Sequence, residues 1–505
     1  MVRSLTPETL VYDLVGAGDP TISPDGARIL YSLGRADRAA KLAGSQLWVC
    51  DIDGGSARQL TRAGDRNGQG RWAPDGSRIA FVSDRVAKSG VFVMALDGGE
   101  PREVTRHNGP VADLAWSPDG TRLAYVALFD PENPDERDLE EWEASRVRVT
   151  RRVDYKQDNR GYLADLRGQV WIVEVETGER RMLTGGAFDH NQPQWSPDGE
   201  RIAAKVPTKN GMCSHLAVVD VQSGQVTEVG PEGGVVGCWA WSPEGDRILI
   251  AGDATPTWQL DLFVHFTGTG DLARLTDDLA CLPDAGFPTV TPASQPVWLD
   301  ETRALFHAVR AGQSGLYVVD TTTGDVEALV SWQALNGGLS VDAAGHFAVQ
   351  GHTSLEEVGE ILVTDLAGRS SRVITRHNAE LLAEAPPARW ERIDVQRGEF
   401  TIEAWLLSPA GFEGGEGGAT RPLVLDVHGG PNGFYGYGFN AVQQSLAAAG
   451  NFVLYCNPRG SSSYGRHFTA QVTRDWGGED YLDLMAAVDE AVTRPGVDAE
   501  RLGVY

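Results

Sequence analysis

Most of the chain repeats one pattern of polar and apolar positions. A turn sequence, Ser-Pro-Asp-Gly or a close variant, is followed by a small or polar residue, an arginine and an apolar run, as in residues 121–126. Turn residues flanked by β-branched and aromatic runs are typical of antiparallel strands. Degraded copies appear around residues 298–303 and 340–343, and the clear copies begin at Ser23, Ala73, Ser117, Ser196 and Ser242.

A second pattern alternates with the first and is counted independently of it. It consists of a strand, a glycine-containing turn, another strand and often a closing Leu-Thr pair, as in residues 46–61 and 169–184. Further copies begin near Val91, Leu216, Leu262, Leu316 and Ile361. Both counts give seven repeats.

Each repeat predicts one four-stranded antiparallel sheet. A single small sheet cannot bury its faces, whereas a ring of sheets can, so we predict a seven-bladed β-propeller. A linear β-solenoid is the competing interpretation, but repeats of roughly 42–57 residues are too long for it.

One spacing breaks the pattern, because 79 residues separate Ser117 from Ser196. Long insertions into a regular scaffold are often functional. We weigh contact with a substrate equally against a solvated hairpin of complementary charges. The excess lies between residues 130 and 168 and holds an acidic run, residues 138–143, and then Arg146, Arg148, Arg151 and Arg152.

The repeats end near Thr375, and Ala385-Pro386-Pro387 marks a domain boundary. We therefore predict two domains, residues 1–385 and 386–505. A short helix over residues 6–15, with Thr6 as its cap and Pro7 at its first position, precedes the first blade. Its place is compatible with packing on the second domain.

The second domain alternates strands with helices. A hairpin over residues 392–408 precedes strands and helices at 423–427, 440–449, 452–456 and 479–492, with a further strand from residue 501. This alternation predicts a doubly wound α/β sheet. On the helix over 479–492, the apolar face is predicted to contain Tyr481, Met485, Val488 and Val492.

Composition and charge then exclude several classes of function. The 505 residues carry 44 basic and 70 acidic side chains, a net charge of −26. Nucleic-acid binding needs clustered Lys and Arg, so nucleic acid is excluded as a partner. Five scattered cysteines without Cys-x-x-Cys spacing predict neither a disulfide framework nor a metal site, and no cofactor is expected. No apolar run has the length of a signal peptide or a membrane span, so we expect a cytoplasmic protein without a membrane partner.

The candidate chemistry begins at residues 422–431, Pro-Leu-Val-Leu-Asp-Val-His-Gly-Gly-Pro. A short apolar run of this kind forms a buried parallel strand. The two glycines after it let the backbone turn with its N–H groups exposed. A strand ending in such a loop resembles the oxyanion loop of an α/β-hydrolase, which stabilises negative charge during acyl transfer.

Further motifs follow in order: Asn-Pro-Arg-Gly-Ser-x-x-Tyr-Gly at 457–465, Trp-Gly-Gly-Glu-Asp at 476–480 and Arg-Leu-Gly-Val-Tyr at 501–505. Together with the blades and His-Gly-Gly-Pro, this series resembles the prolyl oligopeptidase family of serine peptidases. The long third repeat, with Arg-Arg-x-Asp-Tyr at 151–155, is most similar to the acylaminoacyl-peptidase branch. The expected fold is a seven-bladed β-propeller followed by the N-terminal part of an α/β-hydrolase domain.

The resemblance implies a Ser-His-Asp peptidase that hydrolyses short peptides and releases N-acylated amino acids, with the propeller capping its active site. It also implies that the backbone N–H of Gly430, the second glycine of the loop, donates to the oxyanion of the tetrahedral intermediate. Removing one such donor costs about 10²–10³ in rate. We also expect a homo-oligomer, although no residue pattern specifies one.

The sequence departs from the family pattern at its end. In the family, Arg-Leu-Gly-Val-Tyr is followed by Gly-x-Ser-x-Gly, whose serine is the nucleophile, and the acid and the histidine come later. The chain ends at Tyr505 and contains no Gly-x-Ser-x-Gly. We therefore expect the triad Ser, Asp and His to lie beyond residue 505, the hydrolase domain to be truncated and this chain to be inactive alone.

Several residues resemble triad members, and a structural role is favoured for each. His428 lies in the oxyanion loop itself. Ser461–Ser463 lack the strained strand-to-helix elbow that exposes a nucleophile. His467 has no acidic partner evident from the sequence, and Asp475 and Asp480 are better explained as loop or helix-terminal residues.

Two alternatives stay open. A dipeptidyl-peptidase or oligopeptidase of the same family needs acidic groups that hold a free α-amine, and Glu140 and Glu141 could serve. Arg151 and Arg152 could instead hold a peptide carboxylate. The chain could also be a non-catalytic propeller that binds protein partners, although the hydrolase motifs count against this.

Overall fold

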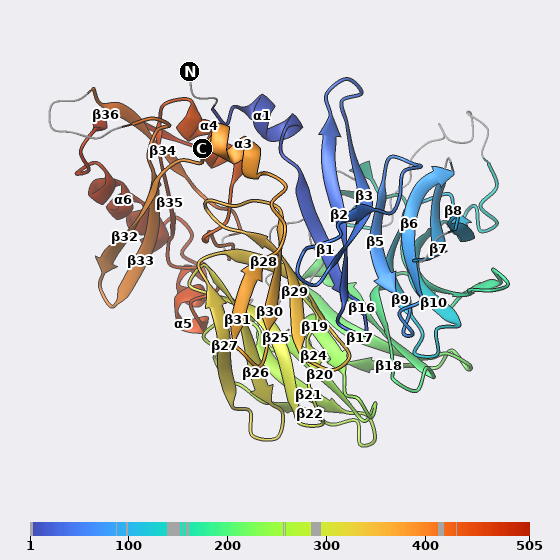
Figure 1. Ribbon diagram of the computed structural model, residues 1–505. Helices are drawn as coiled ribbons and strands as arrows, with labels where there is room; N and C mark the ends of the chain where they lie inside the picture. Colours follow the sequence, from blue (N-terminus) through green and yellow to red (C-terminus); the bar gives the residue numbers. More distant parts are fainter. Residues whose placement is uncertain are drawn as a thin grey trace.

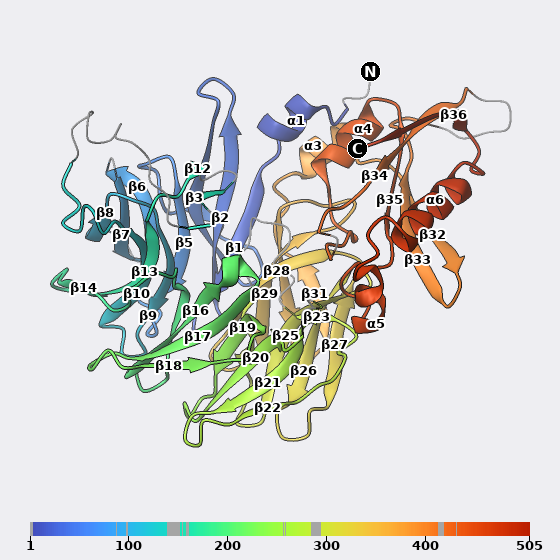
Figure 2. The same cartoon turned by 180° about the vertical axis from the view of Figure 1, so that it is seen from behind.

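The computed structural model describes residues 4–86, 88–96, 99–138, 152–153, 155–157, 161–255, 257, 259–283, 294–412, 419–430 and 432–505. Seven small antiparallel sheets form a ring, and a mixed sheet with its helices lies over one side of that ring (Figure 1). The view from behind shows the second domain on that same side of the ring, and the N and C labels both stand beside the second domain (Figure 2). In the described part of the chain, no helix is long and apolar enough to cross a membrane.

The seven sheets confirm the predicted seven-bladed propeller, because each is built from consecutive stretches of chain. Blades 1 to 3 contain β1 (Gly16–Ile22), β2 (Arg28–Asp37), β3 (Leu42–Asp51) and β4 (Arg58–Gln59); β5 (Asn67–Trp72), β6 (Arg78–Val86), β7 (Lys88–Ala95) and β8 (Arg102–His107); β9 (Val111–Trp116), β10 (Arg122–Phe129), β13 (Arg167–Glu174) and β14 (Arg180–Met182). Blades 4 and 5 contain β15 (Asn191–Trp195), β16 (Arg201–Thr208), β17 (Cys213–Asp220) and β18 (Val226–Val229); β19 (Val235–Trp241), β20 (Arg247–Asp253), β21 (Asp261–Phe266) and β22 (Leu272–Arg274). Blades 6 and 7 contain β23 (Leu282–Pro283), β24 (Val297–Trp298), β25 (Arg303–Arg310), β26 (Gln313–Asp320) and β27 (Val326–Trp332); β28 (Leu335–Val341), β29 (Phe347–Thr353), β30 (Glu360–Asp365) and β31 (Ser370–Val373).

The Ser-Pro-Asp-Gly sequence closes the turn between the first and second strands of a blade. In blade 3, Ser117 Oγ donates to Asp119 Oδ1 at 2.6 Å and accepts the N–H of Arg122 at 2.9 Å. Gly120 has φ +68°, a left-handed conformation that glycine adopts without strain. The motif therefore satisfies its own polar groups, which explains its recurrence at the same place in the blades.

A tryptophan and an arginine join neighbouring blades. Trp195 of blade 4 donates its Nε1–H to Ala115 O of blade 3 at 3.1 Å, and the Arg122 guanidinium lies over its ring at 4.7 Å. The same pair recurs at the four other junctions up to blade 6, between Arg28 and Trp72, Arg78 and Trp116, Arg201 and Trp241, and Arg247 and Trp298. Ile22 of blade 1 and Val341 of blade 7 occupy the place of the tryptophan.

The ring closes between blades 7 and 1 without exchange of a strand. Ile22 N donates to Ser340 Oγ at 3.1 Å, and Ala17 N donates to Gly359 O at 2.8 Å. Just after blade 7, Asn378 bonds both backbone groups of Val15, with Val15 N–Oδ1 at 3.0 Å and Nδ2–Val15 O at 2.8 Å. The first and last residues of the propeller are therefore tied to each other.

The insertion in blade 3 contributes a two-stranded sheet, β11 (Lys156–Gln157) and β12 (Gly161–Tyr162). Its first residues are anchored to blade 2, since Glu136 Oε1 lies 2.9 Å from His107 Nδ1. Arg152 donates to Leu166 O at 3.1 Å and lies 3.5 Å from Asp189 Oδ2. The described residues do not include Glu140, Glu141, Arg146, Arg148 or Arg151.

The second domain has the predicted α/β organisation. Its sheet has the order β32-β33-β35-β34-β36, in which β35, β34 and β36 run parallel. Helix α6 packs on one face of this sheet and α4 on the other. The elements that follow the last blade are α3 (Ala379–Glu384), β32 (Trp390–Arg397), β33 (Phe400–Leu407), β34 (Arg421–Asp426), α4 (Ala441–Ala448), β35 (Phe452–Asn457), α5 (Arg466–Thr469), α6 (Glu479–Ala491) and β36 (Val497–Val504). The predicted boundary after residue 385 falls between α3 and β32 and stays a prediction.

The predicted apolar face of α6 is partly wrong. Tyr481 is 53% exposed, whereas Asp483 is fully buried beside Ala487 and Val488. Asp483 is buried because its carboxylate binds Arg459, a partner that hydrophobic periodicity does not reveal.

Helix α1 (Pro7–Tyr12) begins as predicted, with Thr6 Oγ1 accepting the N–H of Thr9. Leu5 and Leu10 pack against Leu382 and Phe439. The segment before the first blade therefore packs on the second domain.

Candidate active site

The loop after β34 turns so sharply that only glycine fits at two of its positions. Gly430 has φ +131°, and a Cβ there would lie 2.4 Å from Gly433 N. A Cβ at Gly433 would lie 2.4 Å from Gly429 O. Pro431 lies outside the described residues. Within the described chain the N–H of Gly430 has no hydrogen-bond partner, and Gly430 is exposed.

The segment Asn457–Gly465 is the base on which this loop lies. The side chain of Asn457 bonds both backbone groups of Tyr435. Its Oδ1 accepts the N–H of Tyr435 at 2.7 Å, and its Nδ2 donates to Tyr435 O at 2.9 Å. Asn432 Nδ2 donates to Gly460 O at 2.9 Å, and Ser462 N donates to Gly433 O at 3.2 Å. The His-Gly-Gly and Asn-Pro-Arg-Gly motifs, separate in sequence, thus form one structure.

Arg459 fixes this base to helix α6. Its guanidinium donates to both carboxylate oxygens of Asp483, at 2.9 and 2.7 Å, and to Glu479 Oε2 at 2.6 Å. These acidic partners raise the pKa of Arg459 above its usual value. Because Asp483 is fully buried, this is a fixed, charge-assisted contact.

His428 and Ser461 contact each other at the base of the loop. His428 Nε2 lies 3.0 Å from Ser461 Oγ, and its Nδ1 lies 3.0 Å from Gly429 O. Burial lowers the pKa of His428, so the ring is neutral at pH 7. Ser461 Oγ also donates to Pro458 O at 2.7 Å. Ser461–Ser463 are all buried, and their structural role stays a prediction.

The remaining candidates lie away from the loop. His467 is exposed and pairs with Glu399 at 3.5 Å, a partner that the sequence did not indicate because it lies in the β32–β33 turn. Asp480 lies in the first turn of α6 and accepts the N–H of Gly477 at 3.2 Å, a helix-terminal role. Asp475 lies in the turn before that helix, where its carbonyl accepts the N–H of Gly478.

A cavity of about 750 Å³ opens in front of the loop. Its walls come from both domains, since Leu282 and Leu335 belong to blades 6 and 7. The remaining walls come from residues 426–430, 432–436, 438–440 and 443, together with Ser462 and Tyr505. A cavity with apolar and aromatic walls and few polar groups is typical of a binding site for a small molecule or peptide.

The wall of this cavity also contains polar groups. Asp426, the last residue of β34, accepts a hydrogen bond from Gln443 Nε2 at 2.9 Å. Burial and the charge of Asp426 raise the pKa of Tyr435, so its phenol stays protonated. The sequence analysis missed both side chains. The sequence signal that could have indicated Asp426 is a carboxylate at the end of an apolar strand.

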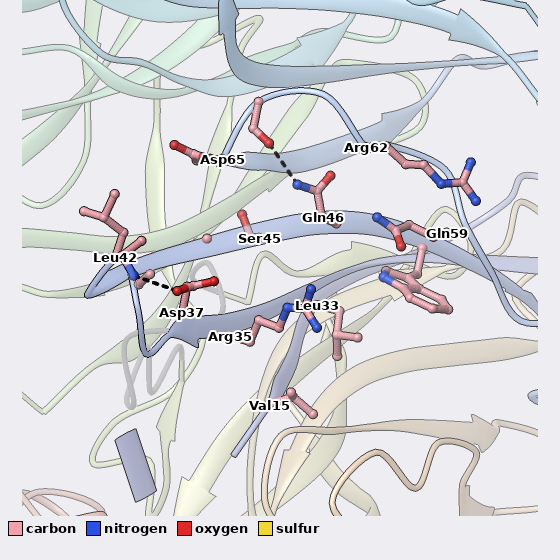
Figure 3. A pocket seen from close by; sticks show the side chains of 15 residues that line it. Val15, Leu33, Arg35, Asp37, Leu42, Ser45, Gln46, Gln59, Arg62 and Asp65 are labelled. Atoms are coloured by element: carbon pink, nitrogen blue, oxygen red, sulfur yellow. Dashed lines mark hydrogen bonds between the residues drawn. The ribbon is translucent and has the colours of Figure 1, made fainter. Parts of the chain in front are cut away.

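A second cavity, of about 400 Å³, lies on blade 1 between the β2–β3 hairpin and residues 59–65 (Figure 3). Its lining carries charges of both signs, including Arg35, Arg62 and Asp37. Gln46 Nε2 donates across it to Gly64 O at 3.0 Å. No histidine or cysteine is among the described residues that line this second cavity.

Comparison with known proteins now identifies the family. Residues 9–134 match the TolB beta propeller domain, and residues 437–505 match the prolyl oligopeptidase family. The uncharacterized peptidase YuxL of Bacillus subtilis (strain 168) is 31% identical over 97% of this chain and 76% of its own length. The chain belongs to the prolyl oligopeptidase family of peptidases.

The chain is also similar to a second relative and to a solved structure. Dipeptidyl-peptidase 5 of Porphyromonas gingivalis (strain ATCC 33277) is 24% identical over 99% of this chain and 74% of its own length. The solved acylaminoacyl peptidase of Pyrococcus horikoshii superposes with a TM-score of 0.78 at 19% identity, over 99% of this chain and 74% of that one. This chain therefore shares the fold of that solved peptidase, a propeller followed by an α/β-hydrolase region.

Proposed function

We propose that this chain forms the propeller and the oxyanion half of a serine peptidase that cleaves short peptides and releases N-acylated amino acids. The observation that carries the proposal is the unpartnered N–H of Gly430 at the mouth of a cavity enclosed by both domains. A backbone N–H that is already fixed stabilises the negative charge of a tetrahedral intermediate without reorganisation. In this assignment His428 supports the loop and is not the base.

The small size of the cavity supports short peptides as substrates. About 750 Å³ between a propeller and a hydrolase domain admits a few residues and excludes a folded protein. The lining is mostly apolar, which suits an acyl cap better than a charged α-amine. The complete gene product should therefore hydrolyse acetyl-alanyl anilide faster, by kcat/KM, than an alanyl-alanyl anilide with a free amine.

A dipeptidyl-peptidase is the second candidate. It is supported by the similarity to dipeptidyl-peptidase 5 and requires an acidic group that holds the α-amine. The reverse order of the two anilides, together with loss of the free-amine activity in Glu140→Gln and Glu141→Gln variants, would favour this candidate.

We propose further that the nucleophile is not among these 505 residues, since no Gly-x-Ser-x-Gly occurs in them. The 505-residue chain should stay unlabelled by a fluorophosphonate probe, whereas the complete gene product should be labelled at one serine. Labelling of the 505-residue chain at Ser461, Ser462 or Ser463 would contradict this assignment. A complete gene product that neither reacts nor hydrolyses peptides would favour a binding propeller. Homo-oligomeric assembly stays a prediction, for light scattering to test.

A further inference from the structure

The threonine that closes a blade makes the same pair of hydrogen bonds in several blades, so the blades can be compared with one another. In blade 1, the closing Thr61 accepts the N–H of Leu47 at 2.9 Å and donates its hydroxyl to Gln46 Oε1 at 2.8 Å. In blade 3, Thr184 bonds Val170 N and Gln169 Oε1 in the same way, at 2.9 and 2.7 Å. The acceptor in both blades is a neutral amide, and the contact is complete within the blade.

Blade 5 has the same contact with a buried charge in place of the amide. Thr276 accepts the N–H of Leu262 at 2.9 Å and donates to Asp261 Oδ1 at 3.0 Å. Asp261 is only 2% exposed. A buried carboxylate is stable only when cations or several donors compensate it, so blade 5 has a requirement that blades 1 and 3 lack.

One of the two cations that meet this requirement comes from the other domain. Arg274 of blade 5 and Arg466 of α5 both donate to Asp261 Oδ2, at 2.5 and 2.6 Å. Arg466 also donates through NH1 to Asp277 Oδ1 at 3.0 Å and through its backbone N–H to Asp278 Oδ1 at 2.5 Å. Arg466 therefore binds three carboxylates of blade 5 at once.

Arg466 directly follows the segment that carries the oxyanion loop. Within that segment Ser462 N holds Gly433 O, and Ser461 Oγ lies 3.0 Å from His428 Nε2. Ser463 O in turn accepts the N–H of Ala311 from blade 6 at 2.9 Å. The segment is thus held between the propeller on one side and the loop of Gly430 on the other.

We infer that Arg466 is a positioning residue, which binds blade 5 and thereby sets the geometry of the Gly430 N–H through residues 460–463. The propeller is then part of the scaffold of the oxyanion hole as well as its cover. This inference rests on the proposed function, since it assigns a catalytic consequence to the contact.

The test compares two arginines that share one carboxylate oxygen. In the complete gene product, Arg466→Met should lower kcat for a peptide anilide about 10–100-fold with KM changed less than threefold, part of the effect of losing an oxyanion donor. Arg274→Met removes the other donor to Asp261 Oδ2 without touching the hydrolase domain, and should change kcat less than threefold. Arg466→Lys keeps the charge and should restore part of kcat.

Hydrogen exchange supplies a readout that does not depend on activity. In the 505-residue chain, Arg466→Met should speed amide exchange in peptides covering residues 429–433 and 460–463 at least tenfold, whereas Arg274→Met should not. Equal effects of the two variants on kcat, or unchanged exchange in residues 429–433, would overturn the inference. An inactive wild-type gene product would refute the proposed function, and the exchange result would still decide the positioning of the loop.

Discussion

Two neighbouring glycines in the loop after β34 meet different steric limits. A Cβ on Gly430 would collide with Gly433 N at 2.4 Å, and its φ of +131° is unsuited to any other residue. A Cβ on Gly429 would meet nothing within 4 Å, and the backbone there is not left-handed. The loop thus contains its own control for the assignment of the oxyanion donor.

Gly430→Ala should lower kcat/KM of the complete gene product about 10²–10³-fold, because the N–H at this position would be displaced. Gly429→Ala should change kcat/KM less than threefold. The measurement is steady-state hydrolysis of a peptide anilide, with thermal unfolding of both variants as a control for folding. Similar activities of the two variants would contradict the role of Gly430.

Asp483 binds Arg459 and so fixes the segment Asn457–Gly465 to helix α6. Asp483→Ala leaves the Arg459 guanidinium, itself only 10% exposed, without its main partner, and should destabilise the second domain by about 3–5 kcal/mol. Glu479→Ala removes a half-exposed carboxylate from the same guanidinium and should cost less than about 1 kcal/mol. Urea unfolding followed by hydrogen exchange in α6 measures both. Equal costs would show that burial of Asp483 is not the deciding factor.

At the scale of the element, an indole is one of the contacts that join a blade to its neighbour. Trp195→Phe removes the bond from Nε1 to Ala115 O and weakens the stacking of Arg122. We expect a loss of about 1–3 kcal/mol, since the carbonyl is left unpaired and a cation–π contact is weakened. Trp476→Phe, at a 72% exposed position, should stay within about 0.5 kcal/mol. Urea unfolding of the whole chain checks both variants, and a loss at Trp476 as large as at Trp195 would count against the junction.

The blades were predictable from sequence because the residues that form each turn and strand of a blade are close together in the chain. Ser117 and Gly120 satisfy their turn within six residues, so the pattern is visible in the chain. The elements of the second domain were predictable for the same reason. The face of α6 was not, because Asp483 finds its partner 24 residues away.

The candidate site was predictable only in part. Gly430 stands in a recognisable motif, and its assignment as an oxyanion donor stays a proposal. The cavity in front of it, and the contacts of Asp426 and Arg466, arise from residues between 17 and 205 positions apart. Such contacts depend on how two domains meet, which no local pattern of apolar and polar residues records.

At the scale of the whole molecule, buried histidines make stability depend on pH. Burial lowers the pKa of His307 to about 4, and it also lowers the pKa of six others: His107, His190, His265, His352, His377 and His428. Below pH 6.5 the unfolded chain therefore binds more protons than the folded chain, and the free energy of unfolding falls as the pH falls.

Between pH 7 and pH 5 the urea midpoint should decrease, and His307 alone should account for about 2 kcal/mol at pH 5. Burial raises the pKa of Glu403 and Asp113 and acts in the opposite direction, but these are two groups against seven. His307→Gln should make the dependence on pH shallower. A midpoint that rises toward pH 5 would show that these histidines are protonated in the folded protein.

The bonds between Val15 and Asn378 place the two ends of the propeller at one point. The chain enters and leaves the ring there, while α1, ahead of that point, packs beside Phe439, beyond it. A ring that the chain enters and leaves at one point is a unit whose replacement needs no change elsewhere in the chain. Recombination at residues 15 and 378 could exchange it for a ring with another number of blades and leave the contact of Leu10 with Phe439 in place.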